Sequence, residues 1–452
     1  MVGTFNFGYL YIHLWEWLAL PVYLFIIFLI AYFYKKRKEE KEPMYRYYVW
    51  GLMVKIFGGI VFGLIYMYYY KGGDTFSYYE SALAMKNLLF HSPLSWLQNE
   101  FGRGNAAKMS LFTPQTGYPL LYMYRSPQTF TVIKVVNLVI IPAFNSYLLA
   151  TVIMAWVCYF GIWRMFKVFA KHYPNIEKEL AIAILFFPSV VFWGSGILKD
   201  SITLSCTGWV VYCLYSIFIV KKRRLFYIFL ILFNLFLILL IKPYIIFALL
   251  PGSLVWIFSR RIYALKNFAA KVLIFPVILL VCISGGYYIL SSLSSYMGKF
   301  SINKAETTAV VTQNDLKQAY YQGHSFDIGL QGKSLSDFIK KSPQAVIAGI
   351  YMPFIWESAN VVMLVSGLEN TFILLLSLYI LFRIKLFSIF RRLFKEPLLF
   401  FAFTYSIFFA FMVGITTSNF GALVRFKIAY LSFFIASLFI LYNGKVKEVE
   451  VE

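Results

Sequence analysis

The chain has 452 residues, of which 60% are hydrophobic and 14% are charged, and its mean hydropathy is +0.70. Soluble globular domains are only about 45–50% apolar, so this composition excludes an ordinary soluble fold. The formal net charge is +22. Lysine and arginine collect in short segments between apolar runs, such as 35-KKRKEEKE-42, 221-KKRR-224 and 383-RIKLFSIFRRLFK-395. Such basic loops lie on the cytoplasmic side of membrane proteins. The charge therefore indicates topology, and we expect no nucleic-acid partner.

Several apolar runs reach the ~20 residues that a helix needs to cross a bilayer. The runs are continuous rather than alternating, which favours helices over a membrane barrel. The sequence therefore predicts an all-α polytopic membrane protein of the bacterial inner membrane with about 11 transmembrane helices. The basic loops place the N-terminus outside and the C-terminus in the cytoplasm, and we expect the first run to be a retained helix. The expected spans are 9–34, 48–70, 145–167, 179–196, 201–220, 225–241, 245–259, 271–291, 364–385, 397–415 and 425–442.

The spans leave two long segments outside the membrane. These two segments separate the groups of spans from one another. In the first, 77-SYYESALAMKNLLFHSPLSWLQ-98 has apolar residues at helical spacing and predicts a helix in the membrane interface. The apolar segment 129–144 predicts a re-entrant or interfacial element. The predicted regions are two N-terminal helices (1–70), a first extracytoplasmic loop (71–144), a transmembrane core (145–291), a second extracytoplasmic loop (292–363) and the C-terminal helices with a short cytoplasmic tail (364–452).

The cysteines and two isolated histidines indicate no metal site and no disulfide framework. The cysteines lie inside apolar runs without ligand spacing and are expected in the core, and the histidines have no ligand-spaced companions. These residues are Cys158, Cys206, Cys213, Cys282, His91 and His324. A cofactor stays open, because Asp74 and Asp200 could share a Mg²⁺-type ion only if they meet in space.

A set of polar and ionisable residues lies near span ends, away from the basic loops. Ionisable residues at such places are rare and functional by default. In the predicted topology they all lie at the outer ends of spans, and the middle of the membrane is nearly free of charge. The set comprises Asp74, Lys199, Asp200, Lys242, Tyr244, Glu357, Arg425 and Lys427.

This combination suits a lipid substrate that carries phosphate. Lysine and arginine side chains hold phosphate oxygens, which makes Lys199, Lys242, Arg425 and Lys427 candidate binding residues. A nearby carboxylate removes the proton of an attacking hydroxyl, a role that fits Asp74. Simpler interpretations remain open: Asp74 as a loop residue, Lys199 and Asp200 as an ion pair at a helix start, Lys242 as a snorkelling side chain and Glu357 as a solvated acid.

The motifs GGDTFSYYESALAM, FTPQTGYPLLYMY, FPSVVFWGSGILKDSITL, LIKPYIIFALLP and GALVRFKIAYLSFFIASLFI resemble, in this order, those of the GT-C class of polyprenyl-phosphate-sugar-dependent glycosyltransferases. The resemblance maps the family's catalytic carboxylate onto Asp74 and a second acidic position onto Asp200. It places Lys242 and Tyr244 in an Arg-Pro-acid turn and Arg425 at the start of the C-terminal helix. The chain departs from the family by an additional early span and by a single Asp in place of a paired acidic motif.

The resemblance implies a GT-C-like membrane glycosyltransferase that moves a sugar from a polyprenyl-phosphate donor to a glycan or lipid acceptor at the extracytoplasmic face, among membrane lipids. Asp74 and Asp200 are then the expected catalytic residues; Lys199, Lys242, Tyr244, Glu357, Arg425 and Lys427 are the expected substrate-binding residues. A weaker resemblance links the chain to O-antigen or capsule polymerases of the EpsG/Wzy type. A lipid-linked oligosaccharide flippase or transporter, with charges and broken helices at the bilayer midplane, and a non-catalytic assembly partner are further alternatives.

Overall fold

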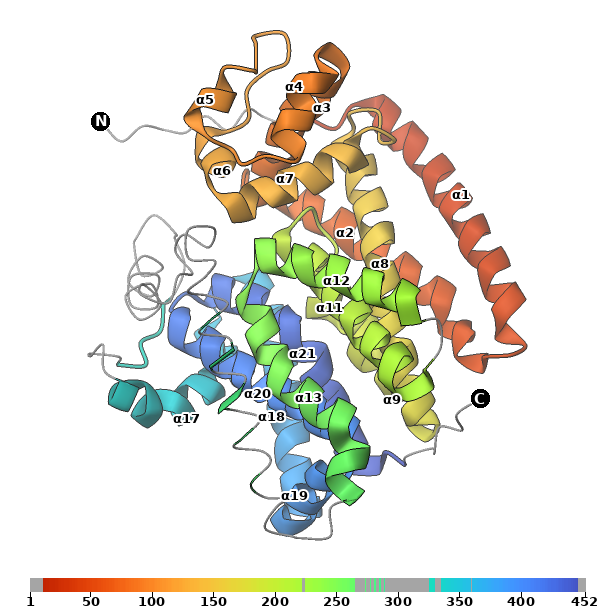
Figure 1. Cartoon of the computed structure of the whole chain (residues 1–452), viewed down its shortest axis with the longest axis vertical. Coiled ribbons are helices and arrows are strands. Elements are labelled where there is room, and N and C mark those ends of the chain that lie inside the picture. The colour runs from red at the N-terminus through yellow and green to blue at the C-terminus, as the bar shows by residue number, and fades with distance from the viewer. Residues whose placement is uncertain are drawn as a thin grey trace. The chain divides into compact units, whose positions relative to one another are not determined.

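Figure 1 shows the computed structural model, which describes residues 11–221, 224–264, 325–329, 335–358 and 360–445 together with isolated residues between 273 and 288. The described residues are almost entirely helical and form no β-strand, apart from an isolated antiparallel bridge between Ser325 and Asn419. The predicted span 271–291 and the predicted loop 292–363 lie mostly outside the described residues. The all-α fold class is therefore confirmed for the part of the chain that the structure describes.

Seven described helices are long and apolar enough to cross a membrane, which indicates a multi-pass membrane protein. They agree with seven of the predicted spans to within a few residues. The helices predicted at 225–241 and 245–259 are also present, within α12 (Arg224–Ile241) and α13 (Tyr244–Ala264). The candidate spans are Leu14–Glu39, Pro43–Tyr68, Tyr147–His172, Lys199–Val220, Val361–Arg383, Pro397–Thr416 and Phe420–Asn443.

The span predicted at 179–196 is not a continuous helix. It is divided into α9 (Glu177–Ala181), a π-helical turn (Ile182–Phe186) and α10 (Pro188–Trp193), and an irregular segment follows at 194–198. Pro188 has no N–H to donate and keeps Phe187 out of the helical region, and Phe187 is accordingly extended (φ −67°, ψ 124°). The apolar composition suggested one helix, but the proline decides the local backbone.

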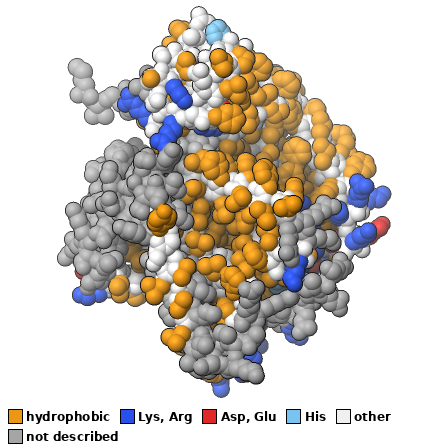
Figure 2. All heavy atoms as spheres, in the orientation of Figure 1, with side chains coloured by type: hydrophobic (Ala, Val, Ile, Leu, Met, Phe, Trp, Pro, Cys, Tyr) orange, Lys and Arg blue, Asp and Glu red, His pale blue; other side chains and the backbone are white. Residues whose placement is uncertain are grey.

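The chain divides into two compact units. The first comprises Met1–Arg164, Val190–Trp209 and Leu240–Lys242, and the second Met165–Ser189, Val210–Leu239 and Pro243–Glu452. The first unit contains α1 (Leu14–Glu39), α2 (Tyr48–Tyr68), the short helices α3 to α7, most of α8 (Tyr147–His172) and the start of α11 (Lys199–Leu214). Figure 2 shows hydrophobic side chains along α1 and charged ones at its end, as expected of a helix that faces lipid.

The predicted first loop, 71–144, is a group of short helices (Figure 1). The expected interfacial helix at 77–98 is present as two helices, because Pro93 starts a new one after Ser92. The apolar segment at 129–144 falls largely in a helix that packs against the first of these. The group comprises α3 (Asp74–His91), α4 (Pro93–Glu100), α5 (Ala106–Met109), α6 (Leu121–Arg125) and α7 (Pro127–Ile140).

The second unit is built around α20 (Pro397–Thr416), which packs against α13, α17 (Leu335–Tyr351) and α21 (Phe420–Asn443). Gly349 and Gly414 lie where α17 and α20 touch, and a side chain at either position would overlap the backbone of the facing helix. Small residues allow such close helix approach in membranes. The unit also contains η7 (Ile355–Glu357), α18 (Val361–Arg383) and α19 (Leu386–Lys395).

Candidate functional site

Asp74 is the first residue of α3, and it is exposed. The turn before it has positive φ at Lys71 (51°), Gly72 (158°) and Gly73 (131°), so the chain reverses sharply after α2. The values at Lys71 and Gly73 lie in the region that favours glycine, and a Cβ at Gly73 would also overlap the ring of Tyr66. The Gly-Gly pair therefore both ends α2 and starts α3. A carboxylate in the first turn of a helix is stabilised by the helix dipole.

Buried contacts fix the start of α3. The hydroxyls of Thr75 and Tyr147 are hydrogen-bonded at 2.9 Å, and the ring of Phe76 packs on that of Tyr147 with centroids 4.9 Å apart. Tyr79 makes an edge contact with the same ring at 5.4 Å. Because Tyr147 belongs to the long helix α8, these contacts attach the start of α3, which carries Asp74, to that helix.

Tyr122, in α6, belongs to the surroundings of Asp74, although the sequence did not single it out. Its hydroxyl donates a hydrogen bond to Ser77 Oγ at 3.0 Å. Partial burial, together with the negative charges of Asp74 and Glu80, raises the pKa of Tyr122, while the bond to Ser77 lowers it. The tyrosine therefore stays neutral at pH 7 and keeps the hydrogen that it donates to Ser77. The sequence could have indicated Tyr122 only through its position in the motif FTPQTGYPLLYMY.

The second predicted group begins at the irregular segment 194–198, which is buried throughout. Lys55, halfway along the span Pro43–Tyr68, reaches this segment. Its ammonium donates to the carbonyl of Gly194 and lies 3.4 Å from Ser195 Oγ. Irregular backbone is tolerated at membrane depth only where protein groups or water satisfy it. Lys55 supplies such a group, and it holds the segment that leads into α11.

Lys199 and Asp200 are the first residues of α11. Lys199 is half-buried, and its ammonium donates to Thr129 Oγ1 at 2.9 Å. Thr129 lies in the first turn of α7, the helix that packs against α3. A positive side chain and a helix N-terminus thus coincide, and both favour a bound anion.

Asp200 forms a buried ion pair with Lys242, the residue directly after α12. The side chains of Lys242 and Asp200 are only 7% and 1% exposed. Each charge is therefore compensated by the other, which gives the pair a structural role in holding α11 to the residue after α12. The partner of Asp200 thus comes from 42 residues further along the chain, whereas the sequence offered only the neighbouring Lys199.

The remaining predicted residues belong to the second unit. Tyr244 is half-buried at the start of α13, with its ring 5.6 Å from that of Phe409. Glu357 is half-buried, and its Oε2 accepts a hydrogen bond from the Phe354 N–H at 2.8 Å. Arg425 is half-buried in the second turn of α21. Their roles toward a substrate stay predictions.

Lys427 is buried and makes contacts inside the protein. Its ammonium donates to the carbonyl of Ile350 at 2.9 Å, to the carbonyl of Met352 and to Asn370 Oδ1 at 3.1 Å. An ammonium has three hydrogens to donate, so these three acceptors match its capacity. Lys427 therefore holds the end of α17, and we leave it out of the substrate-binding set.

Charged residues within candidate spans were not singled out from the sequence, among them Glu16, Lys55 and Glu369. Lys55 lies in α2, and Glu369 lies in α18, where its carboxylate accepts from the backbone N–H of Ser189 at 2.8 Å and from its hydroxyl. Lys55 places a cation halfway along a candidate span, where the sequence analysis named none, and Glu369 adds a carboxylate within another span. Both residues could have been found from the sequence, because each is a charged residue inside an apolar run. The sequence analysis considered only charged residues near span ends.

No group of three or more His, Cys, Asp or Glu side chains that could hold a metal ion occurs among the described residues. Asp74 is exposed and Asp200 is paired with Lys242 in the buried interior. No protein-family model matches the chain, and neither a curated protein nor a solved structure matches it.

Proposed function

We propose that the protein is a membrane glycosyltransferase that moves a sugar from a polyprenyl-phosphate donor to a glycan or lipid acceptor at the extracytoplasmic face of the bacterial inner membrane. The observation that supports the proposal best is the placement of Asp74. It is an exposed carboxylate on the first residue of a helix, directly after a candidate span, and Tyr147 holds that helix in place. A lipid-borne substrate presents its headgroup at the end of a span.

In the proposed reaction, the oxygen of the acceptor hydroxyl forms a bond to the sugar C1, and Asp74 accepts the proton of that hydroxyl. The bond between C1 and the phosphate oxygen breaks, and polyprenyl phosphate leaves with the bonding electrons. Tyr122, whose hydroxyl donates to Ser77 Oγ, belongs to the surroundings of Asp74 in this reaction. A route through a covalent intermediate on a carboxylate is the alternative chemistry.

The departing phosphate needs positive charge. In the first unit, Lys199 at the start of α11 supplies an ammonium and a helix N-terminus together, which suits an anion. Asp200 and Lys242 compensate one another, so in this mechanism they keep α11 in place rather than contact the substrate. The roles of Arg425, Tyr244 and Glu357 toward a substrate stay predictions.

A transporter of lipid-linked oligosaccharide is the second candidate, and two observations favour it. The segment from α9 to α10 is a broken helix, and Lys55 and Glu369 carry charges within spans. Broken helices and charges inside the membrane are features of transporters. However, Lys55 and Glu369 both make hydrogen bonds with the backbone of their own unit, which gives each a structural role.

The experiment that tests the proposal compares wild type with Asp74→Asn at matched membrane levels. Lipid-linked and surface glycans are measured by mass spectrometry. The matched control is Glu40→Gln, which removes another exposed carboxylate, directly after α1. Loss of one sugar with accumulation of its unglycosylated precursor is the expected result, because only the base is removed.

Other outcomes separate the alternatives. If sugars persist and only chain length collapses, the protein is a polymerase of the EpsG/Wzy type. If complete lipid-linked glycan accumulates unchanged on the cytoplasmic side, it is a transporter. A glycan profile that is the same in wild type, Asp74→Asn and Glu40→Gln removes Asp74 from the site and refutes the proposal.

A further inference from the structure

Helix α19 connects two candidate spans. It follows α18 after Ile384 and Lys385, and it is separated from α20 by Glu396 alone. With 10 residues it is about 15 Å long at ~1.5 Å per residue, half the ~30 Å of the hydrocarbon layer. Because both neighbours are long enough to cross the membrane and α19 is not, α19 lies at the membrane surface.

The apolar side chains of α19 occupy one broad sector with two parts. Ile389 and Leu393 form the inward part, and Leu393 is buried. The outward part is exposed, with Leu386 at 57%, Phe387 at 80%, Phe390 at 52% and Phe394 at 58%. At 3.6 residues per turn these four side chains lie side by side. Large apolar side chains clustered in this way mark a protein or membrane contact.

The opposite sector carries cations and no acid. Arg391 and Lys395, one turn apart, are both exposed, and exposed Lys385 precedes the helix. An apolar sector bordered by lysine and arginine is the pattern of a helix that lies in the plane of the membrane. The cations are then level with lipid headgroups, where they attract negative charge.

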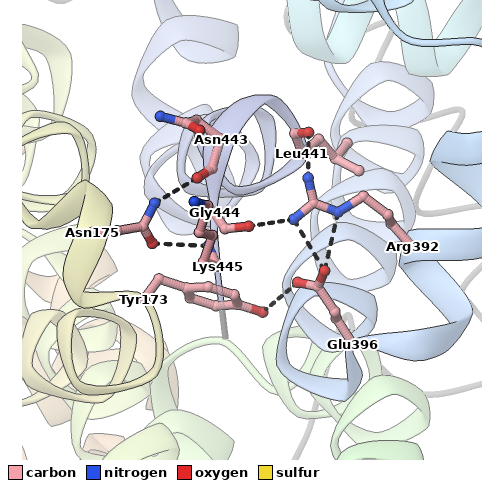
Figure 3. A network of polar contacts seen from close by, with 8 residues as sticks. All are labelled: Tyr173, Asn175, Arg392, Glu396, Leu441, Asn443, Gly444 and Lys445. Carbon is pink, nitrogen blue, oxygen red and sulfur yellow. Dashed lines mark hydrogen bonds and ion pairs between the residues drawn. The ribbon is translucent and has the colours of Figure 1, made fainter. Parts of the chain in front are cut away.

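The third cation of the helix, Arg392, points into the protein and fixes the orientation of α19 (Figure 3). Its guanidinium donates to the carbonyls of Leu441 at 2.7 Å and Gly444 at 2.6 Å, at the end of α21. It also pairs with Glu396 at 3.0 Å, and Glu396 accepts from the Tyr173 hydroxyl at 3.1 Å.

This network keeps α19 from rotating. Asn175 extends it by donating to the carbonyl of Asn443 at 2.6 Å and accepting from the Lys445 N–H at 2.8 Å (Figure 3). The exposed sector of Leu386, Phe387, Phe390 and Phe394 is therefore not an unpacked face that could turn inward. It is held facing outward beside Arg391 and Lys395.

We propose that α19 is a binding site for anionic phospholipid, with the acyl chains against Leu386, Phe387, Phe390 and Phe394 and the phosphate between Arg391 and Lys395. The charge of the helix and its position between two spans identify the ligand as a lipid of the surrounding membrane, rather than a free phosphate or a protein. The proposal is independent of any catalytic activity at Asp74.

The test uses the purified full chain in nanodiscs of phosphatidylcholine with three parts in ten of phosphatidylglycerol. Retained phosphatidylglycerol is counted by native mass spectrometry after delipidation. For Arg391→Gln/Lys395→Gln we expect apparent affinity for phosphatidylglycerol to fall by about 25-fold, which is about fivefold for each cation near a membrane surface. Lys36→Gln/Lys38→Gln is the matched control, because both lysines are exposed at the end of the candidate span α1 but are followed by Glu39, Glu40 and Glu42, which offset their attraction for anionic lipid.

A second variant, Phe387→Ser/Phe390→Ser, tests the acyl-chain contact, and both positions are exposed enough that folding is expected to survive. This variant should lose phosphatidylglycerol and phosphatidylcholine alike, whereas the arginine–lysine variant should lose only the anionic lipid. An equal loss in the control at Lys36 and Lys38 would show attraction by net charge alone and overturn the proposal. Unchanged retention in either α19 variant would overturn it as well.

Discussion

The buried pair of Asp200 and Lys242 allows a sharp prediction about stability. Replacing Asp200 by Asn keeps the shape of the side chain but leaves the Lys242 ammonium without its counter-charge in a site where it is 7% exposed. Breaking a buried ion pair on one side costs about 3–5 kcal/mol, because the remaining charge has lost both water and partner. We expect Asp200→Asn and Lys242→Met each to lower the free energy of unfolding by about this amount.

The double variant should behave differently. Asp200→Asn/Lys242→Met removes both charges, so neither charge is left buried without its partner. We therefore expect the double variant to be more stable than either single variant. Positive coupling of this kind is the signature of residues that act on one another.

The measurement is unfolding of the purified protein in mixed detergent and SDS, followed by tryptophan fluorescence, with glycan analysis of the same variants in cells. If the double variant loses as much stability as the two single variants together, the residues are not coupled and the reasoning is refuted. If Asp200→Asn is as stable as wild type but inactive, Asp200 is catalytic, as the resemblance to the GT-C class implies, and the structural role is wrong.

Two further predictions concern the loop helices. Gly73→Ala should lower stability by about 1–3 kcal/mol, because alanine is strained at a φ of 131°; Gly285→Ala, where an added Cβ meets no atom within 4 Å, is the control, and equal melting temperatures for the two variants would contradict the strain. Burial raises the pKa of Glu100 above its ordinary value, against the lowering effects of Asn137 and Lys134. A raised carboxyl pKa makes the ionised form costly in the folded state, so Glu100→Gln should raise the melting temperature at pH 7, and this gain should disappear below the unfolded pKa of about 4.3; a gain that is constant with pH would contradict it.

Much of the fold could be predicted from the sequence because a bilayer imposes a simple length rule. The apolar runs at 9–34, 145–167 and 397–415 agree with helices of the structure to within a few residues. The rule fails at 179–196, where the composition is apolar enough but Pro188 interrupts the backbone. Hydropathy averages over a window, whereas the missing N–H of one proline acts at one residue.

The candidate site was harder to predict, because the role of a charged side chain in a membrane protein depends on the group that it contacts. Lys242 pairs with Asp200, 42 residues away, and Lys427 bonds carbonyls 75 and 77 residues away. Nothing local in 241-IKPY-244 or 418-SNFGALVRFK-427 indicates those partners, since only the packing of helices creates them. Residue type and position could therefore nominate these lysines but could not separate a structural cation from one that meets a substrate.

Asp74 differs from them, because its placement follows from local chemistry. The turn at Gly73 needs glycine, the helix start after it is fixed by Thr75 and Tyr147, and the carboxylate is exposed at the end of a span. A buried acid such as Asp200 can be explained by the stability of the fold, whereas an exposed acid held by a rigid turn gains little stability from its charge. The two carboxylates should therefore respond differently to neutral replacement: Asp200→Asn should lose stability first, and Asp74→Asn should lose glycan transfer with its stability intact.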